Sequence, residues 1–498
     1  MKSSKALLAL GLALVCAAFT ISGAVRAPAQ TVINFANFDG VDGNRPFGQT
    51  VMQATNGRFY GATFSGGAYG MGNVYELTPS GKLSNVYSFC SLANCADGAY
   101  PLGTPILGND GNLYGVTDSG GGGSNAVGSI GSGTVYKLTL DGKLTTLYAF
   151  CPSLPCSDGQ SPSVVIQGSD GNFYGATSAG GNTGTGTYGE GEGTIFEITS
   201  TGEFKSLYTF CLLAGCLDGS YPGAFIQGND GNFYGTTGSG GTETGGVFYE
   251  FTASGTYTVL HNFCFLENEN CPEGSQPTSI MQDASGNFFG TTFWGGSHAG
   301  HAQGFGTVFK ITPENQFSVL QSFNILNPYP SWQLLLANDG NLYGSTQGSV
   351  VTGINNGTLF EITPEDAYTE LYEFGEAYPG SYVNTPLFQA TNGNLYGTTT
   401  YGGSPRYSYG TVFQVSNGLS PLVETVPVAG KVGQSIIILG NGLPGSTRVT
   451  FNGVAAEFTV ESDTYIKAIV PSGATTGIVS VNTPSGRLNS NPQFVVTK

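Results

Sequence analysis

The chain has 498 residues, of which 79 are glycine, 26 tyrosine and 32 phenylalanine, and only 10% are charged. This composition is typical of a β-protein with many turns, and it excludes an intrinsically disordered chain, which would have few aromatic residues. The net charge of −17 argues against nucleic acid or an anionic membrane as a partner, because phosphate binding requires clustered lysine and arginine.

The first 29 residues have the pattern of an export signal. Lys2 and Lys5 precede an apolar run over residues 6–21, and small residues at 27 and 29 favour cleavage before Gln30. The run is short for a membrane span, and no later run is long enough. We therefore expect residues 1–29 to be a signal peptide and the mature chain to be secreted or displayed on the cell surface without a membrane span.

One short motif then recurs seven times. The copies are TNGRFYG (55–61), NDGNLYG (109–115), SDGNFYG (169–175), NDGNFYG (229–235), ASGNFFG (284–290), NDGNLYG (338–344) and TNGNLYG (391–397). Their central glycines are 53 to 60 residues apart, counting from 57 through 111, 171, 231, 286 and 340 to 393. A period of this length predicts supersecondary units that bury their apolar faces against one another.

The repeat at residues 163–222 contains four strand patterns, over residues 163–167, 172–177, 194–199 and 204–210, which we term a, b, c and d. Tight-turn dipeptides separate a from b and c from d, and longer loops separate the others. Four antiparallel strands per repeat are typical of a propeller blade. No window shows a sustained 3.6-residue period, which excludes a helical solenoid.

The two ends of the array are complementary. Residues 31–38 have the pattern of strand d before any a, b or c, whereas the seventh repeat has no clear d. Pairing residues 32–38 with 411–415 would remove two exposed strand edges. We therefore predict an all-β fold in which residues 30–417 form a seven-bladed β-propeller closed by the N-terminal strand; an open β-solenoid is the alternative.

The antiparallel order places the b–c and d–a loops on one face, here called the loop face, where binding residues usually lie. Its aromatic residues are Trp294, Trp332, Tyr69, Tyr100, Tyr188, Tyr221, Tyr329, Tyr401 and Tyr407. Such side chains either stack on the sugar rings of a glycan or fill gaps between blades.

Eight cysteines form four close pairs at equivalent places in the repeats: Cys90 and Cys95, Cys151 and Cys156, Cys211 and Cys216, and Cys264 and Cys271. In an exported chain this pattern predicts disulfides, each worth roughly 2 kcal/mol because the closed loops are short. A set of metal sites is the weaker alternative, since the spacing is wrong and no histidine completes a ligand shell.

One acid per cysteine loop also recurs: Asp97, Asp158, Asp218 and Glu273. These side chains either bond to loop amides or form a ring that attracts cations. The acids of the repeated motif, Asp110, Asp170, Asp230 and Asp339, are predicted to shape turns, because their spacing lacks the alternating ligands of a calcium loop.

Catalysis requires groups with divided roles, and residues copied once per blade do not divide roles. The unrepeated candidates are Glu190, Glu192, Arg45, Arg406, His298 and His301. The sequence contains no nucleophile elbow, paired-carboxylate signature or phosphate loop, so we expect no catalytic site, cofactor or metal.

The period ends after Asn417. Residues 418–498 contain short strand patterns separated by Asn-Gly and Pro-Ser-Gly turns, which predict a small immunoglobulin-like β-sandwich without cysteines.

Residues 31–417 carry the words D/N-G-N-[LF]-Y-G, [ST]-x-G-G and G-T-[VIL]-[FY]-x-[IVL] in constant order. This word order resembles the GloVer-type tandem repeat of bacterial exported proteins, and the resemblance implies an extracytoplasmic propeller-like array without an established activity. Residues 430–433, 438–440, 449–453, 470–471 and 475–477 resemble an IPT/TIG domain, which implies a structural or adhesive module.

We therefore predict an exported, non-enzymatic binding or scaffold module that recognises a glycan or a protein through its loop face. The residues favoured for binding are Trp294, Trp332, Tyr100, Tyr221, Asp97, Asp158, Asp218 and Glu273. A carbohydrate-active hydrolase or lyase is the main alternative, and a purely structural spacer is the other.

Overall fold

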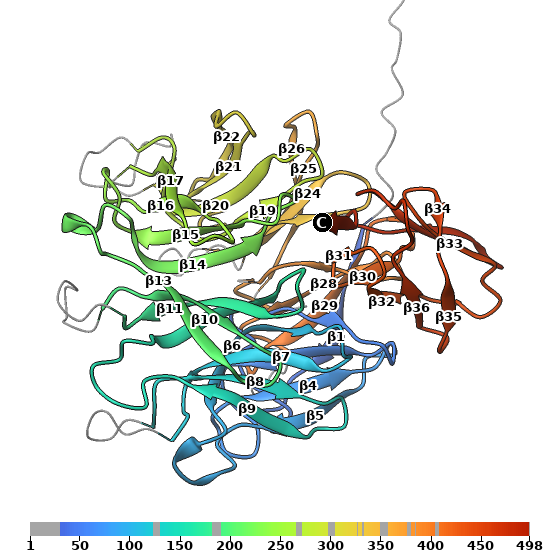
Figure 1. Ribbon diagram of the computed structural model, residues 1–498, viewed down its shortest axis with the longest axis horizontal. Coiled ribbons are helices and arrows are strands. Elements are labelled where there is room, and N and C mark those ends of the chain that lie inside the picture. Colours follow the sequence, from blue (N-terminus) through green and yellow to red (C-terminus); the bar gives the residue numbers. More distant parts are fainter. Residues whose placement is uncertain are drawn as a thin grey trace, which may run out of the picture.

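The computed structural model describes residues 30–122, 130–181, 191–264, 271–296, 304–325, 327–330, 333–348, 357–375, 380–383, 385–403 and 408–497. Within these residues the chain is all-β, apart from two short 3-10 turns at Ala93–Cys95 and Ala214–Cys216. Figure 1 shows the sheets following one another in chain order, from blue through green and yellow to orange, with the C-terminal strands in red.

Six sheets of the repeat are built from consecutive strands, and we number them in chain order. Sheet 1 contains β2 (Met52–Gln53), β3 (Phe59–Thr63), β4 (Asn73–Leu77) and β5 (Leu83–Ser88). Sheet 2 contains β6 (Ala99–Leu107), β7 (Leu113–Ser119), β8 (Thr134–Leu138) and β9 (Leu144–Ala149). Sheet 3 contains β10 (Gln160–Gln167), β11 (Phe173–Ala179), β12 (Thr194–Ile198) and β13 (Phe204–Thr209). Sheet 4 contains β14 (Ser220–Gln227), β15 (Phe233–Ser239), β16 (Val247–Phe251) and β17 (Tyr257–Asn262). Sheet 5 contains β18 (Ser275–Pro277), β19 (Met281–Gln282), β20 (Phe288–Trp294), β21 (Thr307–Ile311) and β22 (Phe317–Ser322). Sheet 6 contains β23 (Leu335–Leu336), β24 (Leu342–Thr346), β25 (Thr358–Ile362) and β26 (Tyr368–Glu373).

Sheet 7 combines the two ends of the repeat array. Its strands are β27 (Phe388–Gln389), β28 (Leu395–Thr399), β29 (Thr411–Ser416) and, antiparallel to β29, the N-terminal β1 (Thr31–Asn37). Val32 pairs with Val415 and Asn37 with Thr411 in this register. The pairing expected between residues 32–38 and 411–415 is therefore present.

The repeated motif has a local physical reason at each glycine. Gly111, the central glycine of one copy, has a φ of 78°, a left-handed conformation that glycine adopts without steric cost. Gly115, the last glycine of that copy, lies in β7 directly against the ring of Tyr136 in β8, where a Cβ atom would overlap the phenol. Tyr136 itself is buried, so the glycine makes room for a core aromatic ring.

Hydrophobic clusters join each sheet to its neighbour. For example, Val116 and Phe150 of sheet 2 pack with Val165 and Phe173 of sheet 3. Equivalent clusters join sheets 1 and 2, 3 and 4, 4 and 5, 5 and 6, and 6 and 7. A further cluster packs Tyr396 of sheet 7 against Phe59 of sheet 1. Burial between sheets is the main source of stability, because each sheet is only four or five strands wide.

The C-terminal domain is a two-layered β-structure. One sheet contains β30 (Glu424–Val426), β32 (Ser435–Leu439), β36 (Tyr465–Ile469) and β35 (Phe458–Val460). The other contains β34 (Val454–Ala455), β33 (Arg448–Phe451), β37 (Val479–Thr483) and β38 (Gly486–Asn489), and β31 (Ala429–Lys431) pairs in parallel with β39 (Val495–Thr497). A separate core that includes Ile438, Val449, Ile466 and Phe494 lies between the layers.

This domain is bound to the face of the array that carries the a–b turns. The Thr464 hydroxyl donates to the carbonyl of Thr55 at 2.6 Å, and the Asn491 amide donates to the carbonyl of Leu336 at 2.8 Å. Ile437 and Leu439 join the hydrophobic cluster of sheets 1 and 2. The turn face is thus partly covered, and the loop face is opposite.

Candidate binding surface on the loop face

An unusual backbone position recurs at the start of β6, β10, β14 and β18 and in the segments that precede β2, β23 and β27. Seven residues at this position have φ between 49° and 61°, namely Arg45, Tyr100, Ser161, Tyr221, Gln276, Tyr329 and Tyr382. Six of them precede proline. Non-glycine residues rarely adopt positive φ, so each must be held by its surroundings. The amide of Tyr100, for example, donates to the carbonyl of Met71 in the preceding repeat at 2.8 Å.

Sheets 5 and 6 meet at an aromatic group on this face. The ring of Tyr329 stacks on Phe293 with centroids 4.9 Å apart, and Trp294 meets Tyr329 edge-on at 5.2 Å. Phe293 and Trp294 end β20, whereas Tyr329 precedes sheet 6. All three side chains are only partly buried.

A second aromatic group lies where sheets 6, 7 and 1 meet. Tyr382 and Tyr401 have ring centroids 5.9 Å apart, and the Tyr382 hydroxyl donates to Oε1 of Gln347 at 3.1 Å. The Arg45 guanidinium lies 5.9 Å from the centre of the Tyr401 ring, within reach of a cation–π contact. Tyr401 remains 38% exposed. We call Trp294, Tyr329, Tyr382 and Tyr401 the aromatic surface.

The two groups are electrostatically connected. Burial raises the pKa of Tyr382, and the neighbouring phenols of Tyr401 and Tyr329 raise it further. Burial likewise raises the pKa of Tyr329. The phenols of Tyr382 and Tyr329 therefore stay protonated and able to donate hydrogen bonds at physiological pH. A rim of rings and hydroxyls with one guanidinium suits a polar ligand with apolar faces.

The other predicted binding residues are placed differently. Tyr100 stacks on Phe64 at 5.0 Å, at the junction of sheets 1 and 2. Tyr221 is 39% exposed at the start of β14. Trp332 lies outside the described residues, as do Glu190, Arg406, His298 and His301. Tyr382 was missed by sequence reasoning, although its place before the seventh innermost strand is equivalent to that of Tyr329.

The four expected disulfides are present, joining Cys90 to Cys95, Cys151 to Cys156, Cys211 to Cys216 and Cys264 to Cys271. The recurring acids hold these loops. Oδ2 of Asp97 accepts hydrogen bonds from the Tyr87 hydroxyl at 2.7 Å and the Ser91 amide at 2.9 Å. Asp158 and Asp218 accept equivalent bonds from Tyr148 and Tyr208, both at 2.8 Å.

This arrangement decides between the two alternatives for the acids. Asp97 is 0% exposed and Asp218 is 1% exposed. Burial by itself raises the pKa of Asp97, but the bonds from Tyr87, Ser91 and the loop amides outweigh it, and the pKa is lowered. Asp97 and Asp218 are internal loop anchors, and the prediction that they face a ligand is wrong because their oxygens are buried against their own loops.

The fourth acid has a different partner. Nε2 of His261 lies 3.4 Å from Oε2 of Glu273, and the imidazole stacks on Phe317 at 4.4 Å. His261 thus occupies the place that tyrosine has in the other three loops. Burial is the main reason that the His261 pKa is lowered, although Glu273 opposes it.

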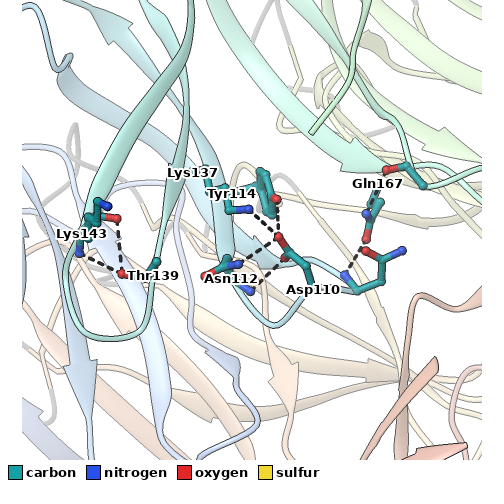
Figure 2. Close-up of polar contacts among 9 residues, drawn as sticks. Asp110, Asn112, Tyr114, Lys137, Thr139, Lys143 and Gln167 are labelled. Carbon is teal, nitrogen blue, oxygen red and sulfur yellow. Dashed lines mark hydrogen bonds and ion pairs between the residues drawn. The ribbon is translucent and has the colours of Figure 1, made fainter. Parts of the chain in front are cut away.

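Figure 2 shows that Asp110, an acid of the repeated motif, bonds within its own turn, as expected. Oδ2 of Asp110 accepts hydrogen bonds from the Tyr114 hydroxyl at 2.8 Å and from the Asn112 side chain at 2.9 Å. Lys137 donates to the same oxygen at 2.6 Å. The described residues contain no cluster of three or more His, Cys, Asp or Glu side chains that could hold a metal ion. Among them, no helix is long and apolar enough to cross a bilayer.

Repeated four-stranded sheets with an appended β-domain define a class of all-β repeat proteins. The chain belongs to the Gloeobacter/Verrucomicrobia repeat family, whose model matches residues 20–224, 122–298 and 221–453. An IPT/TIG domain matches residues 421–496. No curated protein sequence matches the chain.

Among solved structures, the chain is similar to the extracellular domain of a hybrid two-component system from B. thetaiotaomicron, with a TM-score of 0.50 and 11% identity. The match covers 94% of this chain but only 59% of that one. A luciferin-regenerating enzyme is matched at a TM-score of 0.39 and 13% identity, over 79% of this chain and 97% of that chain. A calcium-binding regucalcin from Agrobacterium tumefaciens is matched at a TM-score of 0.37 and 13% identity, over 64% of this chain and 89% of that chain. At these identities the likeness concerns the fold alone.

Proposed function

We propose that the protein is an exported binding module that recognises a glycan through its aromatic surface. The seven sheets would form a closed seven-bladed β-propeller over residues 30–417, with a sandwich over 418–498 and a signal peptide over 1–29. The pairing of β1 with β29 and the cluster joining sheets 7 and 1 support the closed ring. Four disulfides support export, because such bonds persist in oxidising compartments.

The glycan proposal rests on two contacts between aromatic rings. Trp294 lies edge-on to Tyr329, and Tyr382 lies beside Tyr401. Rings held by their neighbours lose little conformational entropy on binding, which favours affinity. The C–H face of a sugar ring is apolar and packs on such rings, while its hydroxyls accept or donate hydrogen bonds. Arg45 and the phenols of the aromatic surface provide partners for those hydroxyls.

A glycan array followed by titration calorimetry on the full chain tests this proposal. We expect Trp294→Ala and Tyr401→Ala each to weaken binding of the selected glycan at least tenfold, since stacked rings commonly dominate a binding free energy. Tyr69→Ala is the matched control, because Tyr69 is 54% exposed on the same face but outside the aromatic surface. Equal affinity for all three variants would contradict the proposed site, and turnover of the bound glycan would contradict a purely binding role.

A further inference from the structure

The innermost strands enclose a cavity that none of the sites above uses. Its volume is about 570 Å³, and its floor is a segment of the C-terminal domain, Glu424 to Val428. The walls come from sheets 1, 2, 3, 4, 6 and 7. Residues of both domains therefore line the cavity.

The wall is predominantly apolar. Leu102, Ile106, Ile166, Ile226 and Leu335 line it and are only partly buried. Its polar side chains are largely engaged with the protein. Thr104, for example, accepts a hydrogen bond from the Thr50 amide at 2.8 Å, and Gln167 bonds to a turn carbonyl at 3.1 Å. The wall thus offers mainly van der Waals contact to anything inside it.

Glu424 is the one ionisable side chain among the residues that line this cavity. It lies on β30, whose pairing with β32 fixes its backbone. Its Oε2 is buried and has no hydrogen-bond partner among the described residues, and the same holds for Oγ1 of the adjacent Thr425. A buried carboxyl oxygen without a partner is costly, so a ligand that supplies the missing donor would relieve that cost.

We infer that this cavity binds a small molecule with an apolar body and one protonated amine, and that the ammonium group pairs with Glu424. A volume of about 570 Å³ lies within the usual range for small-molecule sites. The apolar wall accommodates the body, and the single carboxyl selects a single cationic group. This site is independent of the glycan proposal, because its residues lie on the innermost strands and β30.

The pairing makes binding dependent on pH. Burial raises the pKa of Glu424 from its usual value to about 7. An amine pairs with the ionised carboxylate, so binding must displace a proton when the pH is below that value. We expect affinity to fall roughly tenfold for each unit by which the pH drops below 7, and to level off above it.

The test uses calorimetry on the full chain with hexylammonium and 2-phenylethylammonium, and with the neutral alcohols hexanol and 2-phenylethanol. We expect the amines to bind at pH 8, and Glu424→Gln to weaken amine binding at least tenfold while leaving alcohol binding unchanged. Glu461→Gln, an exposed acid of the same domain, is the matched control and should bind the amines normally.

Ile226→Trp, which places a larger side chain against the cavity, should abolish binding of both series. Amine affinity that is the same in Glu424→Gln and the parent, or that does not change between pH 5 and pH 8, would overturn the pairing. Absence of any amine binding to the parent at millimolar concentration would overturn the site itself. Thermal denaturation of each variant at pH 5, where Glu424 is protonated, separates a failure to fold from a failure to bind.

Discussion

The backbone amide of Thr391 donates a hydrogen bond to Oε1 of Gln53, 338 residues earlier in the chain, at 3.2 Å. The Thr391 hydroxyl donates to the same oxygen at 2.9 Å. Thr391 begins the last copy of the repeated motif, and Gln53 ends the first innermost strand, β2. The contact therefore joins the seventh repeat to the first.

The same bond occurs between consecutive repeats. The backbone amide of Asn109 donates to Oε1 of Gln167 at 3.0 Å. The amides of Ser169 and Asn229 donate in the same way to Oε1 of Gln227 at 2.9 Å and of Gln282 at 2.8 Å. Each of these glutamines also donates its Nε2 to the central glycine carbonyl of its own turn. The glutamines are thus a recurrent link between repeats, and Figure 2 shows the one at Gln167.

We predict that Gln53→Ala and Gln227→Ala each lower the free energy of unfolding by about 1 to 3 kcal/mol, because each leaves turn amides without an acceptor. Urea denaturation measures the loss. Gln316→Ala is the control, since Gln316 is exposed, and should change stability by less than about 0.5 kcal/mol. In a closed ring, Gln53→Ala lowers the free energy of unfolding as much as Gln227→Ala does. A much smaller loss of stability for Gln53→Ala would indicate an open array.

Asp110 should tolerate asparagine but not alanine. The turns of the first and last repeats carry Asn56 and Asn392 at this place, each with a side-chain oxygen that accepts the amide two residues later. Asp110→Ala removes every acceptor and is expected to cost about 1 to 2 kcal/mol in a urea titration. Asp110→Asn should lower the free energy of unfolding by less than half as much. Equal losses for the two variants would show that the ion pair between the Asp110 carboxylate and Lys137 provides the stabilisation.

Asp97 should control the shape of its cysteine loop. Asp97→Asn removes the charge-assisted bonds from Tyr87 and Ser91, and we expect faster hydrogen exchange of the Ser91 and Leu92 amides and a stability loss of about 1.5 to 3 kcal/mol. Because the pKa of Asp97 is lowered, its contribution is present above about pH 4 and is lost as the pH falls further. Tyr87→Phe, which removes a single bond, should have a smaller effect on the same amides.

His261 should make the sheet 4 loop sensitive to acid. The pKa of histidine is about 6.5 in an unfolded chain, and burial lowers it in the folded protein. The unfolded chain therefore binds more protons as the pH falls below 6.5, and stability that is fully present above this pH is progressively lost.

The double substitution His261→Tyr with Glu273→Asp installs the tyrosine–aspartate pair of the other three loops. We expect the variant to lose less stability than the parent between pH 8 and pH 5.5, measured as urea midpoints. The other titrating groups are common to both proteins and cancel in the comparison. An unchanged pH profile would show that the parent imidazole is not protonated in this range on unfolding.

Local patterns predicted most of the strands because the chemistry that forms them is local. The alternation of 194–199 predicted β12 (Thr194–Ile198), and the Asp-Gly and Asn-Gly pairs predicted the turns. The innermost strand β10 begins at Gln160 rather than 163, because Pro162 pairs with Thr177 across a register shift. In the C-terminal domain β30, β31, β34 and β38 were not predicted, since runs of two to four residues are too short to show alternation.

The candidate site was less predictable. Topology alone placed Trp294, Tyr329 and Tyr401 on the loop face, but their grouping with Tyr382 depends on which sheets are neighbours. The acids were ambiguous in sequence because a carboxylate that binds loop amides and one that binds a ligand recur in the same way. Only the burial of Asp97 and Asp218 separates the two.

The sequence by itself determined the repeat, its four strands, its disulfides and the family, because periodicity, turn chemistry and cysteine spacing are properties of short segments. Tertiary structure decided the rest: the glutamine links, the anchoring of the cysteine loops, the aromatic surface and the cavity above Glu424. The glutamine links, the aromatic surface and the cavity each depend on residues from different repeats or domains, and their contacts arise only when the sheets pack side by side and the C-terminal domain docks against them. The anchoring of a cysteine loop lies within one repeat, but it depends on the folded structure that buries the acid.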